Sequence, residues 1–345
     1  MDLTPDMFGP NGLFSTTSLT NAINVIPNEY GRLQEIGLFG EPRGIATTTV
    51  VIERRHGKLN LLSTKTRGEP APANERGKRD AISFVVPHIP LDDILKAEDF
   101  QGVRKFGSAN ELEPLQQKTM EIQESMAKKH FITWEFHRIG AMSGKVLDAD
   151  GSVIHDLYET FGITQKVVDF KLGTAGTAVR TKCLEVSRHI EDNLLGETMT
   201  GVRGMASPEF FDKLIEHESV KDAFMYHSEA TDKLGGDPRK GFKFGGITFE
   251  EYRGSAGALN SDGTTTTRRF IAAGDCRFFP EGTQETFTHH CAPGDFVETA
   301  NTLGLPLYQK AEPGKMNRWI DFHAQSNPLF LCLRPEILVR GHSSD

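Results

Sequence analysis

Residues 47–62 read TTTVVIERRHGKLNLL, and they are the most informative stretch of the chain. β-branched residues dominate positions 47–52, and successive side chains alternate with a period of two, which is typical of a β-strand. His56 and Gly57 suit a turn. The pattern therefore predicts a strand, a turn and a second strand in this stretch.

The stretch continues into a long polar segment. Residues 63–80 (STKTRGEPAPANERGKRD) are rich in proline and glycine, and residues 81–90 (AISFVVPHIP) form a second short β run. Residues 53–79 hold eight Lys and Arg against three acids, a local charge of +5 in a chain that carries −8 overall. Such a basic excursion is either a solvated surface loop or an arm that reaches an acidic surface on a neighbouring chain.

The residues before this excursion have little capacity to form a core. Residues 1–46 contain four prolines and only short apolar clusters. Such a segment cannot bury much apolar surface by itself. We expect it to become ordered only by lying against another part of the molecule or assembly.

Residues 110–142 are the clearest helix. Asn110 is a suitable N-cap with Glu113 three residues later, and apolar residues recur every three or four positions. The helix is expected to stop at Gly144. About 30 residues give a length of roughly 45 Å, with one narrow apolar stripe, so we expect a strut that packs on one side.

The rest of the chain is predicted to be mixed. Residues 145–157 form a hairpin with a turn at 148–151, and residues 207–224 form a helix with Ser207 as N-cap and Pro208 in the first turn. The remaining expected elements are a helix at 181–195, strands at 167–172, 247–252 and 269–273, polar loops at 233–246 and 254–267, and a mainly β C-terminus.

Composition excludes several classes of protein. The 345 residues suggest two domains or one elaborated domain. The net charge of −8 argues against a protein that wraps DNA with its whole surface. The apolar runs are far shorter than a membrane span, and the N-terminus lacks the apolar region of a signal peptide. The four cysteines show no CxxC spacing, which indicates a reducing compartment.

Candidate chemical motifs are incomplete. The segment 148–152 (DADGS) resembles part of a calcium loop but lacks ligands at both ends, so we interpret it as a turn. His289, His290 and Cys291, with Cys276 upstream, could suggest zinc. Adjacent histidines on a strand point to opposite faces, however, and no CxxC or HxxxH accompanies them.

Two further motifs have the same weakness. Ser125 and Lys128 match the SxxK spacing but lie inside the predicted long helix, and residues 235–240 (GGDPRK) lack the ending of a phosphate-binding loop. The sequence therefore predicts no catalytic, cofactor or metal site. We expect that the protein is not an enzyme. An enzyme with a dispersed site that depends on Cys276, His289 or Cys291 is an alternative.

Several short motifs, in order and over some 300 residues, give the sequence a family resemblance. It resembles the lambda-type major capsid protein family of tailed bacteriophages. The stretches that carry the resemblance are LTNAIN (19–24), GLF (37–39), TTTVVIERRHG (47–57), PHIP (87–90), QGVR (101–104), FG (106–107), GA (140–141) with Gly144, LDADGS (147–152), GG (245–246), EYRG (251–254), AP (292–293) and QSNPL (325–329).

The resemblance implies an α+β fold of the Hong Kong 97-like phage capsid type. Its parts would be an N-terminal arm, an extended loop called the E-loop, a peripheral domain with a long spine helix, and an axial domain. The expected boundaries are 1–46 for the arm, 47–90 for the E-loop, 91–164 for the peripheral domain with the spine helix at 110–142, 165–300 for the axial domain, and 301–345 for a return to the peripheral sheet.

The resemblance also implies a function. A major head protein would self-assemble as pentamers and hexamers into the icosahedral shell that encloses phage double-stranded DNA. Its partners would be other copies of itself, a scaffolding protein, a portal, in some phages a decoration protein, and DNA bound non-specifically on the inner face, without a membrane. Its place would be the virion, and the host cytoplasm during assembly. The resemblance argues against a Lys–Asn crosslink between subunits.

The basic excursion supplies the candidate inter-subunit residues. We expect them to meet an acidic surface of a neighbouring subunit: Arg54, Arg55, Lys58, Lys65, Arg67, Arg76, Lys78 and Arg79. Alternative functions are a host encapsulin-like compartment shell on the same fold and another phage component such as a tail protein.

Overall fold

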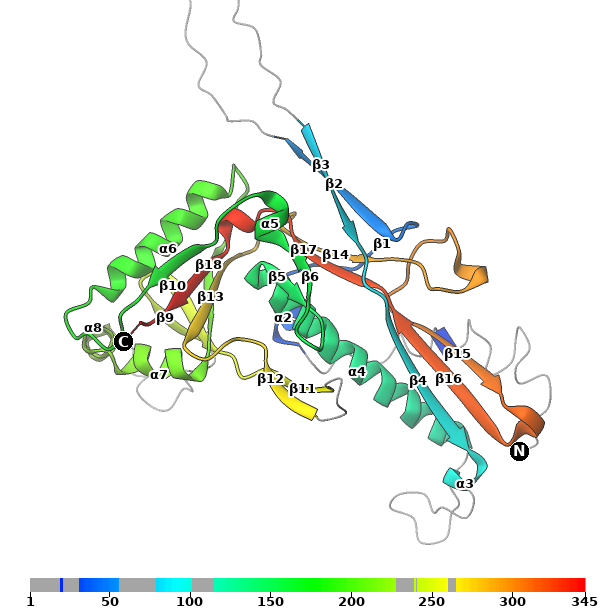
Figure 1. The fold of residues 1–345 in the computed structure, drawn as a ribbon. Coiled ribbons are helices and arrows are strands. Elements are labelled where there is room, and N and C mark those ends of the chain that lie inside the picture. Colours follow the sequence, from blue (N-terminus) through cyan, green and yellow to red (C-terminus); the bar gives the residue numbers. More distant parts are fainter. Residues whose placement is uncertain are drawn as a thin grey trace, which may run out of the picture.

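The computed structural model describes residues 19–20, 31–55, 79–100, 115–227, 239, 241–259 and 265–344. These residues form a mixed α+β molecule with a helix-covered sheet at one end, a long helix beside a second sheet at the other, and a projecting two-stranded ribbon (Figure 1).

The long helix α4 spans Leu115–Ser143, 29 residues. It ends where the sequence predicts, because Gly144 follows with a φ of 84°, a conformation that glycine adopts readily. A Cβ atom at Gly144 would also overlap the ring of Tyr158. The predicted start, with Asn110 as N-cap, lies outside the described residues.

A three-stranded antiparallel sheet lies beside α4 (Figure 1). Its order is β15 (Tyr308–Pro313), β16 (Trp319–Ser326) and β4 (Ile89–Lys96). The short helix α3 (Ala97–Phe100) follows β4, and the 3₁₀ turn η4 (Lys315–Asn317) joins β15 to β16. Residues from both halves of the sequence therefore build this sheet.

A second small sheet packs against α4. It joins β14 (Phe287–Cys291) and β17 (Pro328–Cys332) in antiparallel fashion, with β1 (Arg43–Gly44) added parallel to β14. The short helix α2 (Arg32–Glu35) precedes β1, and the 3₁₀ turn η3 (Val297–Thr299) lies between β14 and β15.

The helix-covered end contains a six-stranded sheet. Helices α6 (Val179–Asn193), α7 (Pro208–Glu216) and α8 (Glu218–His227) lie around it, with the turn η5 (Pro335–Ile337) beside α6. Phenylalanines dominate its core, where the Phe278 ring lies 5.5 Å from Phe170 and 5.7 Å from Phe249. The strand order is β7 (Lys166–Asp169), β18 (Val339–His342), β13 (Asp275–Glu281), β8 (Gly201–Ala206), β10 (Ile247–Glu251) and β9 (Phe242–Phe244).

None of these three sheets is built from one continuous part of the sequence. Strand β14, at 287–291, joins β17 and β1, whereas β18, at the very end of the chain, returns to the six-stranded sheet between β7 and β13. The last strands of the chain are therefore divided among all three sheets.

The hairpin predicted at 145–157 is confirmed as β5 (Lys145–Leu147) and β6 (Val153–Asp156), followed by α5 (Leu157–Phe161). The Ser207 cap is also confirmed, because its Oγ accepts from Phe210 N at 3.3 Å. The single helix predicted at 207–224 is wrong in length. His217 has an extended ψ of 133°, which ends α7 before α8 begins.

Two predicted polar loops contain strands. Residues 254–267 were expected to be a loop, but β11 (Ser255–Leu259) and β12 (Thr265–Arg269) pair as a hairpin, and the strand expected at 269–273 ends at Arg269. The loop expected at 233–246 contains β9, which pairs with β10. In β9 the ladder and the stacked Phe242 and Phe244 rings outweigh the flanking glycines.

The ribbon consists of β2 (Thr49–Arg55) and β3 (Arg79–Val85). It projects away from the rest of the molecule in Figure 1. The strand predicted at 47–55 is confirmed. Its described partner is β3, and the predicted turn at His56 and Gly57, with the strand after it, lies outside the described residues.

Candidate assembly interface

The base of the ribbon is fixed to the β5–β6 hairpin and to α5 by the last two residues of β3. Phe84 is buried, with its ring 5.5 Å from His155 in an edge-on arrangement and 6.1 Å from Phe161 in a stacked one. His155 Nε2 donates to the carbonyl oxygen of Val85 at 2.8 Å. Burial lowers the pKa of His155, which favours the neutral ring. The ribbon therefore leaves the body from a defined point.

The structure places the predicted inter-subunit residues only in part. Arg54 and Arg55 lie at the outer end of β2, and Arg79 begins β3 opposite Arg55. The other five basic residues lie outside the described residues: Lys58, Lys65, Arg67, Arg76 and Lys78. The ribbon thus carries basic residues at the end farthest from its base.

Residues 31–48, which we call the strap, lead from α2 to the ribbon. Leu33 is fully buried, and its N–H donates to Glu135 Oε1 of α4 at 2.9 Å. Arg32 Nε donates to Glu250 Oε1 of β10 at 2.6 Å, and Arg203 of β8 also pairs with Glu250. The strap therefore contacts both the long helix and the six-stranded sheet. This agrees, for its residues, with the expectation that the N-terminal segment is ordered by lying against another part of the molecule.

A buried ion pair lies under the strap. Glu135 and Arg138 are each about 2% exposed, with Oε2 and Nη1 3.6 Å apart. Arg138 also donates to Gln34 Oε1 of the strap and lies 4.8 Å above the Phe330 ring. Burial raises the pKa of Glu135 and lowers the pKa of Arg138, so each charge depends on the other for stabilisation.

Further along the strap, the backbone of Ile45 lies between β14 and the segment at residue 304. Ile45 N donates to Cys291 O at 2.9 Å, and Gly304 N donates to Ile45 O at 2.9 Å. A Cβ atom at Gly44 would lie 2.6 Å from Gly304 O, and one at Gly304 would overlap Cys291 O. Glycine is therefore required at both positions for β14, the strap and the segment at 304 to pack together.

The outward face of the β15–β16–β4 sheet carries an exposed pair of acids. Glu312 lies directly opposite Asp321 in register, and both are exposed. Neither forms an ion pair with any described residue. The next row holds Lys310, His323 and Asp92, in which Lys310 is paired with Glu298 of η3 and His323 Nδ1 with Asp92.

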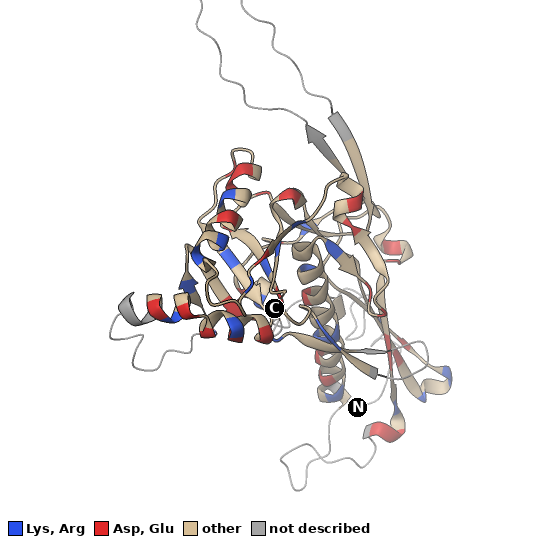
Figure 2. Cartoon of the chain, turned by 60° about the vertical axis from the view of Figure 1, so that its left-hand side comes forward, with Lys and Arg blue, Asp and Glu red and all other residues tan. Residues whose placement is uncertain are grey.

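Like charges directly opposite each other on neighbouring strands are unfavourable. We call Asp92, Glu312 and Asp321 the acidic face; Figure 2 shows the acids of the described residues in red. Sequence reasoning did not find this surface, because β16 pairs with β4, a strand more than 200 residues away in the sequence.

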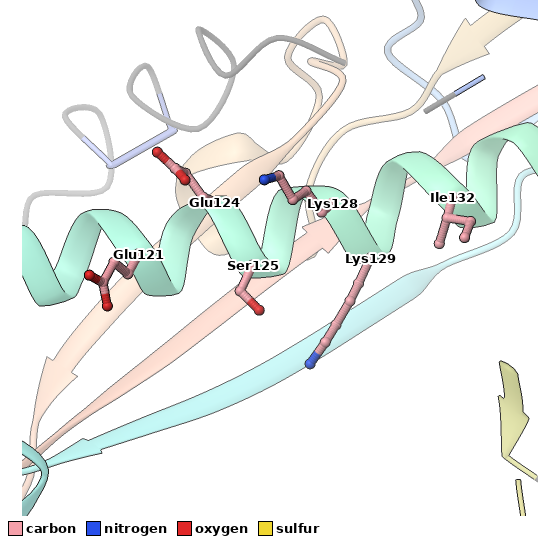
Figure 3. Close-up of a pocket in the computed structure, with 6 residues that line it drawn as sticks. All are labelled: Glu121, Glu124, Ser125, Lys128, Lys129 and Ile132. Atoms are coloured by element: carbon pink, nitrogen blue, oxygen red, sulfur yellow. The ribbon is translucent and has the colours of Figure 1, made fainter. Parts of the chain in front are cut away.

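The exposed side of α4 lines a shallow hollow of about 520 Å³ (Figure 3). Its described lining residues are Glu121, Glu124, Ser125, Lys128, Lys129 and Ile132. Ser125 and Lys128 leave the helix on different sides in Figure 3, so the SxxK spacing does not bring the hydroxyl to the amine.

The cysteines and His289, singled out in the sequence, are core residues, whereas His290 is half-buried. All four cysteines are buried, and desolvation raises the pKa of each thiol, to about 12 for Cys291. His289 stacks on Phe330 with ring centres 4.2 Å apart, and burial lowers its pKa. These groups are held in their neutral forms, which suits packing rather than nucleophilic chemistry.

The described residues also bear on metal binding and on membrane insertion. Among them, no three His, Cys, Asp or Glu side chains lie close enough together to hold a metal ion. No helix in the described ranges combines the length and the apolar character needed to cross a membrane.

The arrangement of ribbon, long helix and helix-covered sheet is that of phage capsid proteins. A putative capsid protein of a prophage of E. coli CFT073 superposes with a TM-score of 0.55 at 11% identity, covering 95% of this chain and 99% of that chain. The capsid of cyanophage P-SCSP1u gives 0.51 at 11% identity, covering 88% and 86%. The fold is therefore the α+β Hong Kong 97-like capsid fold, as expected.

Sequence comparison gives the family. The family described as "Phage major capsid protein E" matches residues 15–343. The major capsid protein of Pseudomonas phage KPP10 is 31% identical, over 96% of this chain and 97% of the relative. That of Salmonella phage Felix O1 (isolate Felix O1-VT1) is 29% identical, over 94% and 95%. The chain belongs to the phage major capsid protein E family, which confirms the predicted phage capsid family.

Proposed function

We propose that the chain is the major head protein of a tailed phage and self-assembles as pentamers and hexamers into the icosahedral shell around double-stranded DNA. The observation that carries the proposal is the family match over residues 15–343, together with relatives named major capsid protein that align over nearly their full length. Identical subunits joined by heterologous contacts close into rings when the rotation between them closes.

The described elements suit the parts of such a subunit. The strap would belong to the N-terminal arm, the ribbon to the E-loop, α4 to the spine of a peripheral domain, and the six-stranded sheet to an axial domain. A ribbon that projects from the body and exposes Val51 would gain order from neighbouring copies, which couples folding to assembly.

The E-loop charge would act between subunits. Residues 53–79 carry +5, so the rest of the chain carries −13. The acidic face is a suitable receiving surface, because Glu312 and Asp321 have no cation of their own among the described residues. A single exposed ion pair contributes only about 0–1 kcal/mol. The same contact repeated around a shell would contribute collectively.

Other partners follow from the same role. A scaffolding protein and a portal would direct assembly, a decoration protein could bind outside, and DNA would contact the inner wall without sequence specificity. The net charge of −8 would keep that contact weak. The protein would reside in the virion, and in the host cytoplasm during assembly, and would act as a structural protein rather than an enzyme.

Electron microscopy of the chain expressed alone, after sedimentation, tests the proposal. Closed shells, or rings of five and six subunits, are the expected result. Where only monomers form, coexpression with a phage scaffolding protein is the second arm. Absence of shells and rings in both arms would overturn the proposal.

A further inference from the structure

The register of the ribbon determines which backbone groups point out of its edges. In an antiparallel ladder, residues in alternate rungs direct both N–H and C=O toward the partner strand, and the others direct them outward. Val86 N donates to Thr48 O at 2.9 Å, which fixes the hydrogen-bonded rungs. The rung that joins Val51 to Ser83 is then one whose backbone groups point outward. The contact of His155 with the outward carbonyl of Val85 agrees with this assignment.

The outer edge of β2 is open. Within the described part of the chain, nothing hydrogen-bonds to the backbone N–H or C=O of Val51, and the carbonyl of Thr49 accepts only from the nearby Thr47 hydroxyl at 2.7 Å. The Val51 side chain is 62% exposed. Strand β2 contains no proline, and its first four residues, TVVI, are β-branched. Such an edge is a template for another strand.

The edge of β4 is closed by contrast. Ala97 N donates to Arg318 O, so the outward residues of β4 are 90, 92, 94 and 96. Pro90 has no N–H, Ile94 N donates to Asp93 Oδ1 at 2.8 Å, and Lys96 N donates to Asp99 Oδ2 at 2.8 Å. Three of the four positions therefore cannot offer a free N–H to an incoming strand.

The edge of β15 is also largely closed. Its outward residues are 309, 311 and 313, because the alternate residues bond to β16. Gln309 N donates to Thr20 Oγ1 at 3.1 Å, and Pro313 has no N–H. Both outer edges of the three-stranded sheet are thus blocked, whereas the more exposed ribbon is not.

The two edges of the ribbon are not equivalent. At its base, the β5–β6 hairpin contacts β3 through His155 at the outward carbonyl of Val85. Among the residues that the structure describes, no such neighbour hydrogen-bonds along β2, and its only strand partner there is β3. A two-stranded ribbon is marginally stable by itself and gains from a third strand.

We propose that the outer edge of β2 receives an extended segment of a second copy of this chain, which adds as a third strand. The inference rests on the proposed shell function, because it requires neighbouring copies. Strand addition requires a polypeptide backbone, which excludes nucleic acid as the occupant. Residues 53–79 carry +5 and the rest of the chain carries −13, so a second copy is electrostatically complementary.

Two proline variants on the same rung test the proposal. Val51→Pro removes the outward N–H of β2, whereas Ser83→Pro removes the outward N–H of β3 directly opposite. Neither N–H belongs to the β2–β3 ladder, so both ribbons should form. We expect V51P to reduce the fraction of chain in sedimenting particles about tenfold or more, and S83P to assemble like wild type. Equal assembly of the two variants would overturn the proposal.

Amide hydrogen exchange provides a readout that does not depend on a variant. On assembly of the wild-type chain, the Val51 and Glu53 amides should exchange about tenfold more slowly or slower still, while Val50 and Ile52 are already bonded within the ribbon. Unchanged exchange at Val51 in assembled particles would overturn strand addition but leave the shell function intact. Failure of the wild-type chain to form any shell would instead overturn the proposed function.

Discussion

The backbone N–H of Leu33 donates to the carboxylate of Glu135 over 2.9 Å, and the bond joins residues 102 positions apart. The leucine side chain is fully buried beside it. The strap is therefore ordered by a polar contact and an apolar contact with α4 at the same point. A segment without a core of its own becomes part of the body in this way.

The ion pair beneath that contact predicts a loss of stability in Glu135→Gln. The amide keeps the shape of the carboxyl but leaves Arg138 buried without its counter-charge. We expect the free energy of unfolding to fall by about 3 kcal/mol, measured by urea denaturation of the unassembled chain. The double variant E135Q/R138M should recover part of that loss, because it removes the uncompensated charge. Wild-type stability in E135Q alone would contradict the ion-pair interpretation.

Acid should destabilise the subunit through buried histidines of α4. Burial lowers the pKa of His130 and of His137 from 6.5 to about 4. The unfolded chain then binds protons that the folded chain does not, so stability falls as the pH drops from about 6.5 to about 4. The loss should be about 2 kcal/mol for each ring at pH 5.

The variant His137→Met tests this effect. His137 Nδ1 is buried without a hydrogen-bond partner in the described structure, so replacement leaves no partner unsatisfied there. Urea midpoints at pH 7.5 and pH 5 should differ less for H137M than for wild type. Between pH 7.5 and pH 9, where both rings are neutral, this contribution should not change. An identical acid loss in the two proteins would contradict the assignment.

The local elements were predictable where one residue determines a boundary. Gly144 ends α4 and Ser207 caps α7, and both effects are visible in the sequence. The strands β9 and β11 were not predicted, since they lie in polar, glycine-rich sequence and depend on their partners. The acidic face was missed for the same reason. Its members come from three strands, and only pairing brings Asp92 into line with residues beyond 300.

The contact of Gly304 with Cys291 predicts that Gly304→Ala displaces the strap. The added methyl group would overlap the Cys291 carbonyl oxygen and disturb the bond from Gly304 N to Ile45 O. We expect a loss of about 1–3 kcal/mol by thermal or urea unfolding. Gly176→Ala is the matched control, because an added Cβ there meets nothing within 4 Å. A loss of equal size in both variants would show that the strap contact is not the cause.

Glu312 and Asp321 carry like charges and face each other across the β15–β16 ladder. Glu312→Lys should therefore have separate effects on folding and on assembly. The lysine would face Asp321 and turn a repulsive pair into an attractive one, so the isolated subunit should gain about 0.2–1 kcal/mol. Assembly should weaken, because the acidic face would lose charge that the E-loop needs. Glu216→Lys, at the exposed end of α7, makes the same charge change as a control and should assemble normally. Normal assembly of E312K would exclude Glu312 from the receiving surface.

Charge reversal of the E-loop is the complementary prediction. Replacing Arg54, Arg55, Arg76 and Arg79 by Glu should block shells while the subunit stays folded, because Arg54, Arg55 and Arg79 lie at the outer end of the projecting ribbon. Replacement of the same four by Lys keeps the charge and should permit assembly. Normal shells from the Glu variant, seen by sedimentation and electron microscopy, would refute an electrostatic role for the E-loop.

A charge swap decides whether the two surfaces meet each other. The pair R54E/R55E and the pair E312K/D321K should each reduce assembly, because each leaves like charges facing across the interface. Combined in one chain, they restore opposite charges with the sign exchanged, so the yield of shells should recover toward that of wild type. Additive loss in the fourfold variant would mean that the E-loop and the acidic face bind different partners. Recovery specific to this combination would show that they bind one another in neighbouring subunits.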